Sequence, residues 1–262
     1  MKSNRLISMI KQIVKKFLSN YGYTLRKIKK KDHDLNFDEI LVKYLPNNPV
    51  IFDIGANKGQ SIEKFLKIFK NPQIHSFEPI KDEIDILKKK YKDNKNIYLN
   101  DFALGEKNEL KNFNITAKSD NSSFNKINLD TDWVKVRSGQ NNTNVKNYVE
   151  KIEKVKVITL DEYVKSQKIE DIDLVKMDTQ GYEDKILEGS IETIKKNKIS
   201  IIKTEIMFDD NYNKYLNFID IEKYIIPYNF RIVGIDMVHD NMFSGLVFSG
   251  DVMYFNKNKI KF

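Results

Sequence analysis

Short apolar runs alternate with amphipathic stretches along most of the chain. Five of the runs have the composition of strands buried on both faces of a sheet: Val50–Ile54, Ile74–Phe77, Ile97–Leu99, Leu174–Met177 and Ile199–Thr204. Apolar residues at helical spacing fill three of the stretches between them, Gln60–Phe69, Lys81–Tyr91 and Tyr182–Lys196. This alternation predicts an α/β fold in which a mostly parallel sheet carries helices on both faces.

Two regions depart from this alternation. The apolar segments 231–238 and 246–255 are joined by a polar loop that begins at His239, which predicts an antiparallel hairpin at one edge of the sheet. Residues 118–150 are polar and weakly periodic, and they include the single tryptophan, Trp133. Because so long an insertion in a compact domain is usually functional or mobile, we expect it, with the hairpin loop, to build a binding pocket.

The start of the chain carries the excess of positive charge. The net charge is +8, from 45 Lys and Arg against 37 Asp and Glu. Residues 1–31 hold ten of the basic residues and no acidic one, which leaves 35 against 37, or −2, for the rest. Apolar residues recur at helical spacing over Leu6–Tyr21, with lysines on the other face. We therefore predict a basic amphipathic helical segment over residues 1–36 and a folded domain over residues 37–262.

This helical segment has two interpretations. Its apolar face packs on the folded domain or on a sister subunit of a homo-oligomer, or it lies in the plane of an anionic membrane surface. No apolar run is long enough to span a bilayer, and the start of the chain lacks the features of a signal peptide. We expect a cytoplasmic protein, peripheral at the inner face of the membrane under the second interpretation.

Composition excludes several kinds of chemistry. The chain has no cysteine, which excludes disulfides, thiolate metal sites and a cysteine nucleophile, and agrees with a cytoplasmic location. Nucleic-acid enzymes usually carry a basic catalytic domain, whereas this chain is near neutral after residue 31. We therefore expect no nucleic-acid partner.

The strongest chemical signal follows the first predicted strand, in the stretch "VIFDIGANKGQ". Dinucleotide folds prefer G-x-G-x-x-G, but here Asn57 stands where the second glycine lets a pyrophosphate approach the backbone. Asp53, just before the glycines Gly55 and Gly59, would repel a phosphate and favour a cationic ligand. Glu78 ends the second strand, where a carboxylate can accept both hydroxyls of a ribose. A cation beside one acid and a ribose beside the next describe S-adenosylmethionine.

At this point the sequence resembles the FkbM-type class I methyltransferases over roughly residues 49–255. The resemblance rests on ordered blocks: "FDIGANKGQ", "HSFEP", "NDFALG", "NSSF", "VITLDEY", "IDLVKMDTQGYEDKILEG", "IIKTE" and "GDVMYF". It implies a Rossmann-like sheet of seven strands in the order 3-2-1-4-5-7-6, with the last strand antiparallel. It also implies methyl transfer from S-adenosylmethionine to a hydroxyl of a sugar, glycan or related natural product.

The resemblance and the strand ends together nominate the site residues. The predicted cofactor-binding residues are Asp53, Gly55, Ala56, Asn57, Gly59, Glu78, Pro79, Asp101, Phe102, Ala103 and Asp178, with Asp101 and Phe102 along the adenine or Asp101 merely capping a turn. Asp178, which ends the fourth strand, is the first candidate for the base that deprotonates the acceptor, followed by Glu205 and His239. Lys176 lies on the same side of its strand as Asp178. Gln180 replaces the family's usual glutamate, so we expect no metal site.

Other polar residues have structural interpretations, which we prefer for them. Thr159 and Glu162 have the spacing of a capping box, Glu183 suits the first turn of a helix, and His75 falls inside a strand. The glycines could likewise serve only a tight turn and close helix packing. The alternative to an enzyme is a catalytically degenerate methyltransferase fold that acts as a binding or assembly module through its basic helix.

Overall fold

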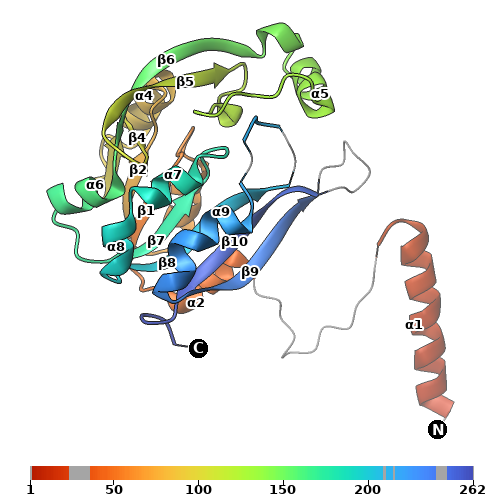
Figure 1. Ribbon diagram of the computed structural model, residues 1–262. Helices are drawn as coiled ribbons and strands as arrows, with labels where there is room; N and C mark the ends of the chain where they lie inside the picture. The colour runs from red at the N-terminus through yellow and green to blue at the C-terminus, as the bar shows by residue number, and fades with distance from the viewer. Residues whose placement is uncertain (1, 24–35, 209–210, 215, 240–246, 262) are drawn as a thin grey trace. The chain divides into compact units, whose positions relative to one another are not determined.

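The chain divides into two units, residues 1–36 and residues 37–262. The computed structural model describes residues 2–23, 36–208, 211–214, 216–239 and 247–261 (Figure 1). In the first unit the helix α1 spans Lys2–Asn20, as the periodicity predicts, and ends in a turn around Gly22. No helix within these described ranges has both the length and the apolar character needed to cross a bilayer.

A seven-stranded sheet forms the centre of the second unit. Its order is β3-β2-β1-β7-β8-β10-β9, which is the order that the family resemblance implied. The first five of these strands are parallel, and β10 is antiparallel to both of its neighbours, so the predicted hairpin is confirmed. The strands are β1 (Val50–Ile54), β2 (Gln73–Phe77), β3 (Ile97–Asn100), β7 (Ile172–Met177), β8 (Ile199–Met207), β9 (Phe230–His239) and β10 (Val247–Asn256).

Helices cover both faces of this sheet, so that the central parallel strands β1, β2, β7 and β8 are buried on both sides. On one face lie α2 (Phe37–Tyr44), α3 (Gln60–Ile68) and α4 (Lys81–Lys90), which pack on strand residues such as Ile51 and Ile74. On the other face lie α6 (Leu160–Ser166), α7 (Glu183–Glu188), α8 (Ile191–Lys195) and α9 (Phe218–Ile225), followed by the short 3-10 helix η3 (Ile226–Tyr228). Figure 1 shows α7, α8 and α9 in front of the sheet.

The predicted helix over Tyr182–Lys196 is divided into α7 and α8. Gly189 and Ser190 separate them, and a Cβ atom on Gly189 would lie 2.0 Å from the carbonyl oxygen of Gly105. The chain bends here because the backbone must pass close to the segment after β4. Periodicity alone could not show this contact, since the apolar spacing continues through the break.

A second, three-stranded sheet flanks the predicted insertion. It consists of β4 (Ala103–Leu104), β6 (Val149–Ile158) and β5 (Glu109–Thr116), in that order. Between β5 and β6 lie the 3-10 helix η1 (Ser119–Asn121), α5 (Asp132–Gln140) and the 3-10 helix η2 (Val145–Asn147). Trp133, Tyr148 and Tyr212 bury their rings together in a small core. The insertion is therefore a packed subdomain, whose small core includes Tyr212 from the segment after β8.

Candidate active site

The site begins at the turn after β1, where the backbone adopts left-handed conformations at Gly55, Asn57 and Gly59, with φ of 81°, 46° and 84°. A Cβ on Gly55 would lie 2.0 Å from the carbonyl oxygen of Asp178, so glycine lets the loops after β1 and β7 touch. A Cβ on Gly59 would lie 2.7 Å from the Leu87 side chain. Both glycines thus serve the turn and close packing, and they leave the turn's backbone beside the cavity.

Glu78 follows β2 and is anchored by the backbone around it. The N–H of Asn57 donates to its Oε2 and the N–H of Ile80 donates to its Oε1, each at 2.8 Å. Only 4% of the residue is exposed, and this burial raises the pKa of Glu78 to about 7, although the two N–H donors act against the shift. Each carboxylate oxygen keeps a lone pair for a further donor.

Asp53 lies behind the cavity. Its side chain is fully buried, and the Lys176 ammonium lies 3.2 Å from its Oδ1. Lys176 also lies 3.6 Å from Oδ2 of Asp178 and donates to the carbonyl oxygen of Gly55 at 3.2 Å. Burial alone would lower the pKa of Lys176, but the Asp53 and Asp178 charges outweigh it and raise that pKa. We predicted that Asp53 contacts a cationic ligand directly. In the structure its buried carboxylate forms an ion pair with Lys176 instead.

These elements enclose a cavity of about 320 Å³, within the ~300–1,000 Å³ typical of small-molecule sites. The turn after β1, the end of β2, β4, the insertion and the loop after β7 line it. The predicted cofactor residues in the lining are Gly55, Ala56, Asn57, Glu78, Pro79, Ala103 and Asp178. The predicted cofactor residues therefore share one cavity, with the exceptions of Asp53, Gly59, Asp101 and Phe102.

The insertion reaches across to the glycine turn. Asn57 Nδ2 donates to Ser119 Oγ at 3.4 Å, and Ser119 and Ser122 both line the cavity. The hydroxyl of Tyr148 donates to Oδ1 of Asn121 at 3.0 Å, which ties η1 to the insertion's own core. The segment 119–122 is therefore a strap over one side of the cavity, fixed at Asn121.

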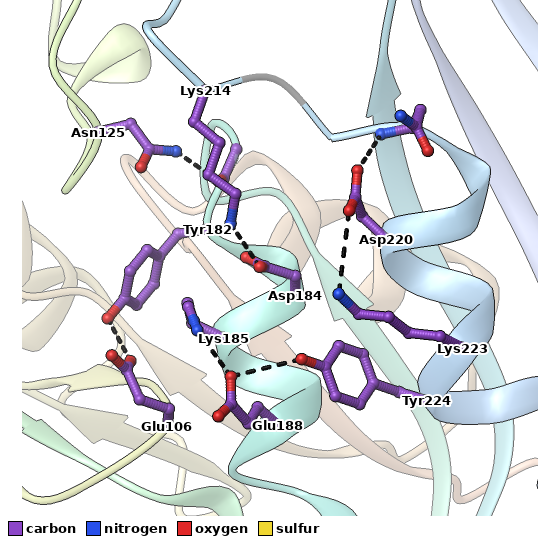
Figure 2. A network of polar contacts seen from close by, with 12 residues as sticks. Glu106, Asn125, Tyr182, Asp184, Lys185, Glu188, Lys214, Asp220, Lys223 and Tyr224 are labelled. Atoms are coloured by element: carbon purple, nitrogen blue, oxygen red, sulfur yellow. Dashed lines mark hydrogen bonds and ion pairs between the residues drawn. The ribbon is translucent and has the colours of Figure 1, made fainter.

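An aromatic wall continues from the strap. The Phe124 ring lies between those of Phe113 and Tyr182, with ring centroids 4.8 Å and 4.4 Å away. All three residues line the cavity. Figure 2 shows the Tyr182 hydroxyl directed at Glu106, to which it donates at 2.6 Å, and Lys111 donates to the same hydroxyl at 2.7 Å. Burial and the Glu106 carboxylate raise the pKa of Tyr182, so it remains a neutral wall residue.

Two carboxylates meet where β7 and β8 end. Nε2 of Gln180 donates to Oδ1 of Asp178 at 3.1 Å and to Oε2 of Glu205 at 3.0 Å. Asp178 lines the cavity, whereas Glu205 lies outside the lining. Burial, followed by the neighbouring charges of Asp178 and Glu183, raises the pKa of Glu205 to about 8. The pair can therefore hold a proton near neutral pH.

The family comparison decides what this cavity serves. The sequence matches the methyltransferase FkbM domain family over residues 53–232, more than half of the chain. The chain belongs to the FkbM methyltransferase family. It is an S-adenosylmethionine-dependent methyltransferase, as the motifs implied.

Several solved structures are distantly similar to this methyltransferase. An rRNA methylase from Streptococcus thermophilus shares 12% identity and covers 88% of this chain and 99% of its own, with a TM-score of 0.44. Sp1610 from Streptococcus pneumoniae shares 7%, covers 90% and 73%, and gives 0.45. Fibrillarin from Aeropyrum pernix, solved with bound S-adenosyl-L-methionine, shares 11%, covers 80% and 68%, and gives 0.42. No curated protein matches the sequence.

The residues present fit the methyltransferase's cofactor. Glu78 offers two carboxylate oxygens with free lone pairs, which suits the two hydroxyls of a ribose. Ile80, Leu104 and Phe113 form an apolar part of the same cavity, which suits a flat base. Asp178 supplies a negative charge in the lining for the cationic end of the molecule.

Two predicted cofactor residues turn away from the cavity. Lys88 donates to Oδ2 of Asp101 at 2.9 Å, and the Asp101 side chain is 63% exposed. The Phe102 ring packs on those of Phe77 and Tyr163 instead, with ring centroids 5.9 Å and 6.1 Å away. Neither residue is in the lining, so the structure does not bring them to the cofactor cavity.

The structure describes the side chains of His75 and Thr159, for which the sequence favoured structural roles. His75 is buried, its Nδ1 lies 2.8 Å from the Tyr163 hydroxyl, and burial lowers the pKa of His75 to about 4. Thr159 caps α6 by accepting from the N–H of Glu162 at 3.1 Å. The side chain of His239 lies outside the described residues.

Glu183 has the structural role that its position predicted. The N–H and the hydroxyl of Thr179 both donate to Oε1 of Glu183, at 2.6 Å and 3.0 Å, so this carboxylate holds the turn between β7 and α7. Among the described residues, no group of three or more His, Asp or Glu side chains has the arrangement of a metal site.

Sequence reasoning missed several residues of the site. Ser119, Ser122, Phe124 and Tyr182 line the cavity, yet none was a candidate. The blocks "NSSF" and "TQGYE" contain three of them, so their presence in the family pattern was the available signal. What the blocks could not show is that the insertion folds back onto the loop after β7.

Proposed function

We propose that this methyltransferase acts on a hydroxyl group of a sugar, a glycan or a related natural product. A hydroxyl must lose a proton as it is methylated, and a placed base typically contributes roughly 10²- to 10⁴-fold to such a step. The observation that carries the proposal is the pair of carboxylates, Asp178 in the lining and Glu205 behind it, joined through one amide. An acceptor that needs no deprotonation would not require such a pair.

The chain's own residues have separate tasks in this reaction. S-adenosylmethionine supplies a methyl group on a sulfonium, and its transfer leaves S-adenosylhomocysteine and a proton from the acceptor hydroxyl. Glu78 holds the cofactor, and Asp178 accepts the proton. Lys176 compensates the charge of Asp178 from 3.6 Å, while the strap and the aromatic wall limit the access of water. Positioning of this kind supplies up to about 7–11 kcal/mol in well-oriented cases.

The distribution of charge supports the proposed acceptor and location. The chain outside residues 1–31 has a net charge of −2, from 35 basic and 37 acidic residues, which does not favour a nucleic-acid partner. The basic helix α1 would hold a cytoplasmic enzyme at the inner face of an anionic membrane, where glycans are built on lipid carriers. A lipid-linked glycan is therefore the acceptor to test first.

Mass spectrometry tests the proposal directly. The protein is incubated with S-adenosylmethionine and with fractionated free glycans, lipid-linked glycans and, as a control, RNA. We expect a methylated product whose fragments place the new methyl on a glycan hydroxyl, and no such product with the Asp178→Asn variant. A protein that binds the cofactor but methylates none of these fractions would support the alternative, a degenerate binding module. Methylation of the RNA control would show that the acceptor is a nucleic acid rather than a glycan.

A further inference from the structure

One side chain connects the two carboxylates of the site with the strap. Nε2 of Gln180 donates to Asp178 and to Glu205, at 3.1 Å and 3.0 Å. On its other side, the Tyr212 hydroxyl lies 3.1 Å from Oε1 of Gln180 and 2.9 Å from the carbonyl oxygen of Asn121 in the strap. Every hydrogen-bonding group of the Gln180 amide therefore faces a partner.

The chemistry of the partners fixes the orientation of this amide. Ionised carboxylates only accept hydrogen bonds, so the NH₂ group must face Asp178 and Glu205, and the amide oxygen must face the Tyr212 hydroxyl. The amide thus donates to both Asp178 and Glu205 without adding charge of its own, and its hydrogen bond to Glu205 favours the ionised form of that carboxyl group. A glutamate at position 180 could donate to neither carboxylate in its ionised form.

The backbone at this position is also unusual. Gln180 has a φ of 58°, in the left-handed region that glycine and asparagine occupy most readily. A non-glycine residue in this region is strained, and it persists where the surroundings impose the conformation. The hydroxyl of Ser123 donates to the Gln180 carbonyl oxygen at 2.8 Å, which holds the strained turn from the insertion side. This left-handed backbone conformation places the Gln180 side chain between the two carboxylates.

The charges around the pair are unbalanced. From β7 and α7 come Lys176 and Glu183, and from β10 comes Asp251, whose charge is partly neutralised by Lys203 at 2.5 Å. Lys176 lies near Asp178 and pairs with Asp53, but no ion pair to Glu205 occurs among the described residues. The hydrogen bonds that favour the ionised form of Glu205 come from neutral donors, the Gln180 amide and the Ser249 side chain.

We propose that Gln180 is a positioning residue, whose amide holds Asp178 and Glu205 together so that the two carboxylates act as one proton acceptor at the cavity. The proposal rests on the proposed function for its chemical meaning, because only a hydroxyl acceptor gives the pair a proton to take. In this arrangement the neutral amide bridges the two carboxyl groups by donating a hydrogen bond to each. Tyr212, which also contacts the strap, sets the orientation of the amide.

Carboxyl titration of the intact protein tests the proposal without an acceptor. Carbon-13 labels on glutamate carboxyl groups report the midpoint for Glu205, assigned by its loss in Glu205→Gln. Gln180→Met keeps the length of the side chain but donates nothing, so we expect the Glu205 midpoint to rise by about one pH unit. Gln180→Glu adds a third carboxylate and should raise it further. The exposed residue Gln167 provides the matched control, since Gln167→Met should leave the midpoint unchanged.

The order of these midpoints decides the outcome. A rise from wild type to Gln180→Met to Gln180→Glu supports the positioning role, whereas equal midpoints in wild type and Gln180→Met reduce Gln180 to a space-filling residue and overturn it. If the Gln180 variants fail to fold, Tyr212→Phe removes the hydroxyl that orients the amide and should raise the midpoint by a smaller amount; no rise overturns the proposal. Cofactor binding is measured in the same samples, and the glycan assay is separate, so a wrong acceptor class and a wrong role for Gln180 give different results.

Discussion

The backbone N–H of Asn57 donates to Oε2 of Glu78 at 2.8 Å, so the turn after β1 and the carboxylate after β2 form one unit. The two segments come from neighbouring parallel strands, which end at the same edge of the sheet. This hydrogen bond fixes the carboxylate before any ligand arrives. The cofactor therefore meets an acceptor whose orientation is already set, which lowers the ordering cost of binding.

Removal of the Glu78 carboxylate should weaken cofactor binding. Glu78→Ala deletes a charged hydrogen-bond acceptor, so we expect a loss of about 1.5–3 kcal/mol, which is roughly 10- to 150-fold in Kd for S-adenosylmethionine. Isothermal titration measures it, with NAD as a ligand that should not bind. Glu63→Gln, an exposed glutamate on α3, is the control. Equal affinity in a folded Glu78→Ala protein would disprove the ribose assignment.

The same carboxylate should make binding depend on pH. Because burial raises the pKa of Glu78 to about 7, part of the free protein carries a neutral carboxyl group at neutral pH. Ribose hydroxyls donate best to the ionised form, so binding favours proton release, and affinity should fall as the pH drops below about 7. Titrations at about pH 6 in buffers of different ionisation enthalpy should show the released proton. In Glu78→Gln both effects should vanish, and their persistence would assign them to another group.

Gly55 should tolerate no side chain. Its φ of 81° is unfavourable for alanine, and a Cβ would lie 2.0 Å from the Asp178 carbonyl oxygen. We expect Gly55→Ala to lower the free energy of unfolding by more than about 2 kcal/mol, measured by urea denaturation. Gly139, in α5, has open space around it, so Gly139→Ala should instead raise stability by about 0.5–1 kcal/mol. Equal effects of the two substitutions would contradict the close approach of the two loops.

His75 should make the fold sensitive to acid. Its pKa is lowered by burial to about 4, against an ordinary value of 6.5. The unfolded chain therefore binds a proton more readily, and the stability that neutral His75 provides is lost as the pH falls from about 6.5 to about 4. The full difference is about 3 kcal/mol. His75→Phe should flatten this part of the curve of unfolding free energy against pH, whatever it does to stability at pH 7. An unchanged slope would show that other groups cause it.

The sequence predicted the main sheet well because its central strands β1, β2, β7 and β8 are buried on both faces. Runs such as Val50–Ile54 and Ile199–Thr204 owe their apolar composition to that burial, and the two helical layers follow from the spacing between them. The second sheet was not predicted, because half of the residues of β6 are charged and the strand pairs with β5 across some forty residues, as in Asn112 opposite Lys154. Local pattern carries no information on such distant partners.

The sequence likewise predicted part of the site, namely the residues at the ends of strands. Residues at strand ends, such as Glu78 and Asp178, meet in the cavity because parallel topology brings them there. The direction of a side chain in a turn is not encoded in this way, and Asp101 points to Lys88 rather than to the cavity. The sequence showed that Gln180 removes a charge, but only the three-dimensional arrangement shows that its amide meets two carboxylates.

Asp178 should matter for turnover more than for cofactor binding. Asp178→Asn keeps the shape of the side chain but removes the proton acceptor, so we expect turnover to fall roughly 10²- to 10⁴-fold. The Kd for S-adenosylmethionine should change much less, because Glu78 and the glycine turn remain. Glu205→Gln, which alters the partner outside the lining, should have a smaller effect. Near wild-type turnover in Asp178→Asn would make Asp178 structural and Glu205 the leading base.

The helix α1 should bring the protein to anionic membranes. Ile13, Phe17 and Tyr21 expose 60%, 61% and 68% of their surfaces, and residues 1–31 carry ten basic side chains without an acidic one. Each Lys or Arg near an anionic surface contributes about 1 kcal/mol, so several together can hold the enzyme reversibly in the interface plane.

Sedimentation with vesicles separates this role from packing on protein. The full chain should pellet with vesicles that contain anionic lipid and not with neutral ones, and added salt should release it because screening weakens the attraction. Phe17→Ser should weaken binding by removing apolar contact, while Lys15→Glu should weaken it through charge and reduce the salt dependence. The chain without residues 1–31 should stay in solution. If the full chain never pellets, or the shortened chain still does, the apolar face of α1 must serve a protein contact, and the acceptor need not be attached to a lipid.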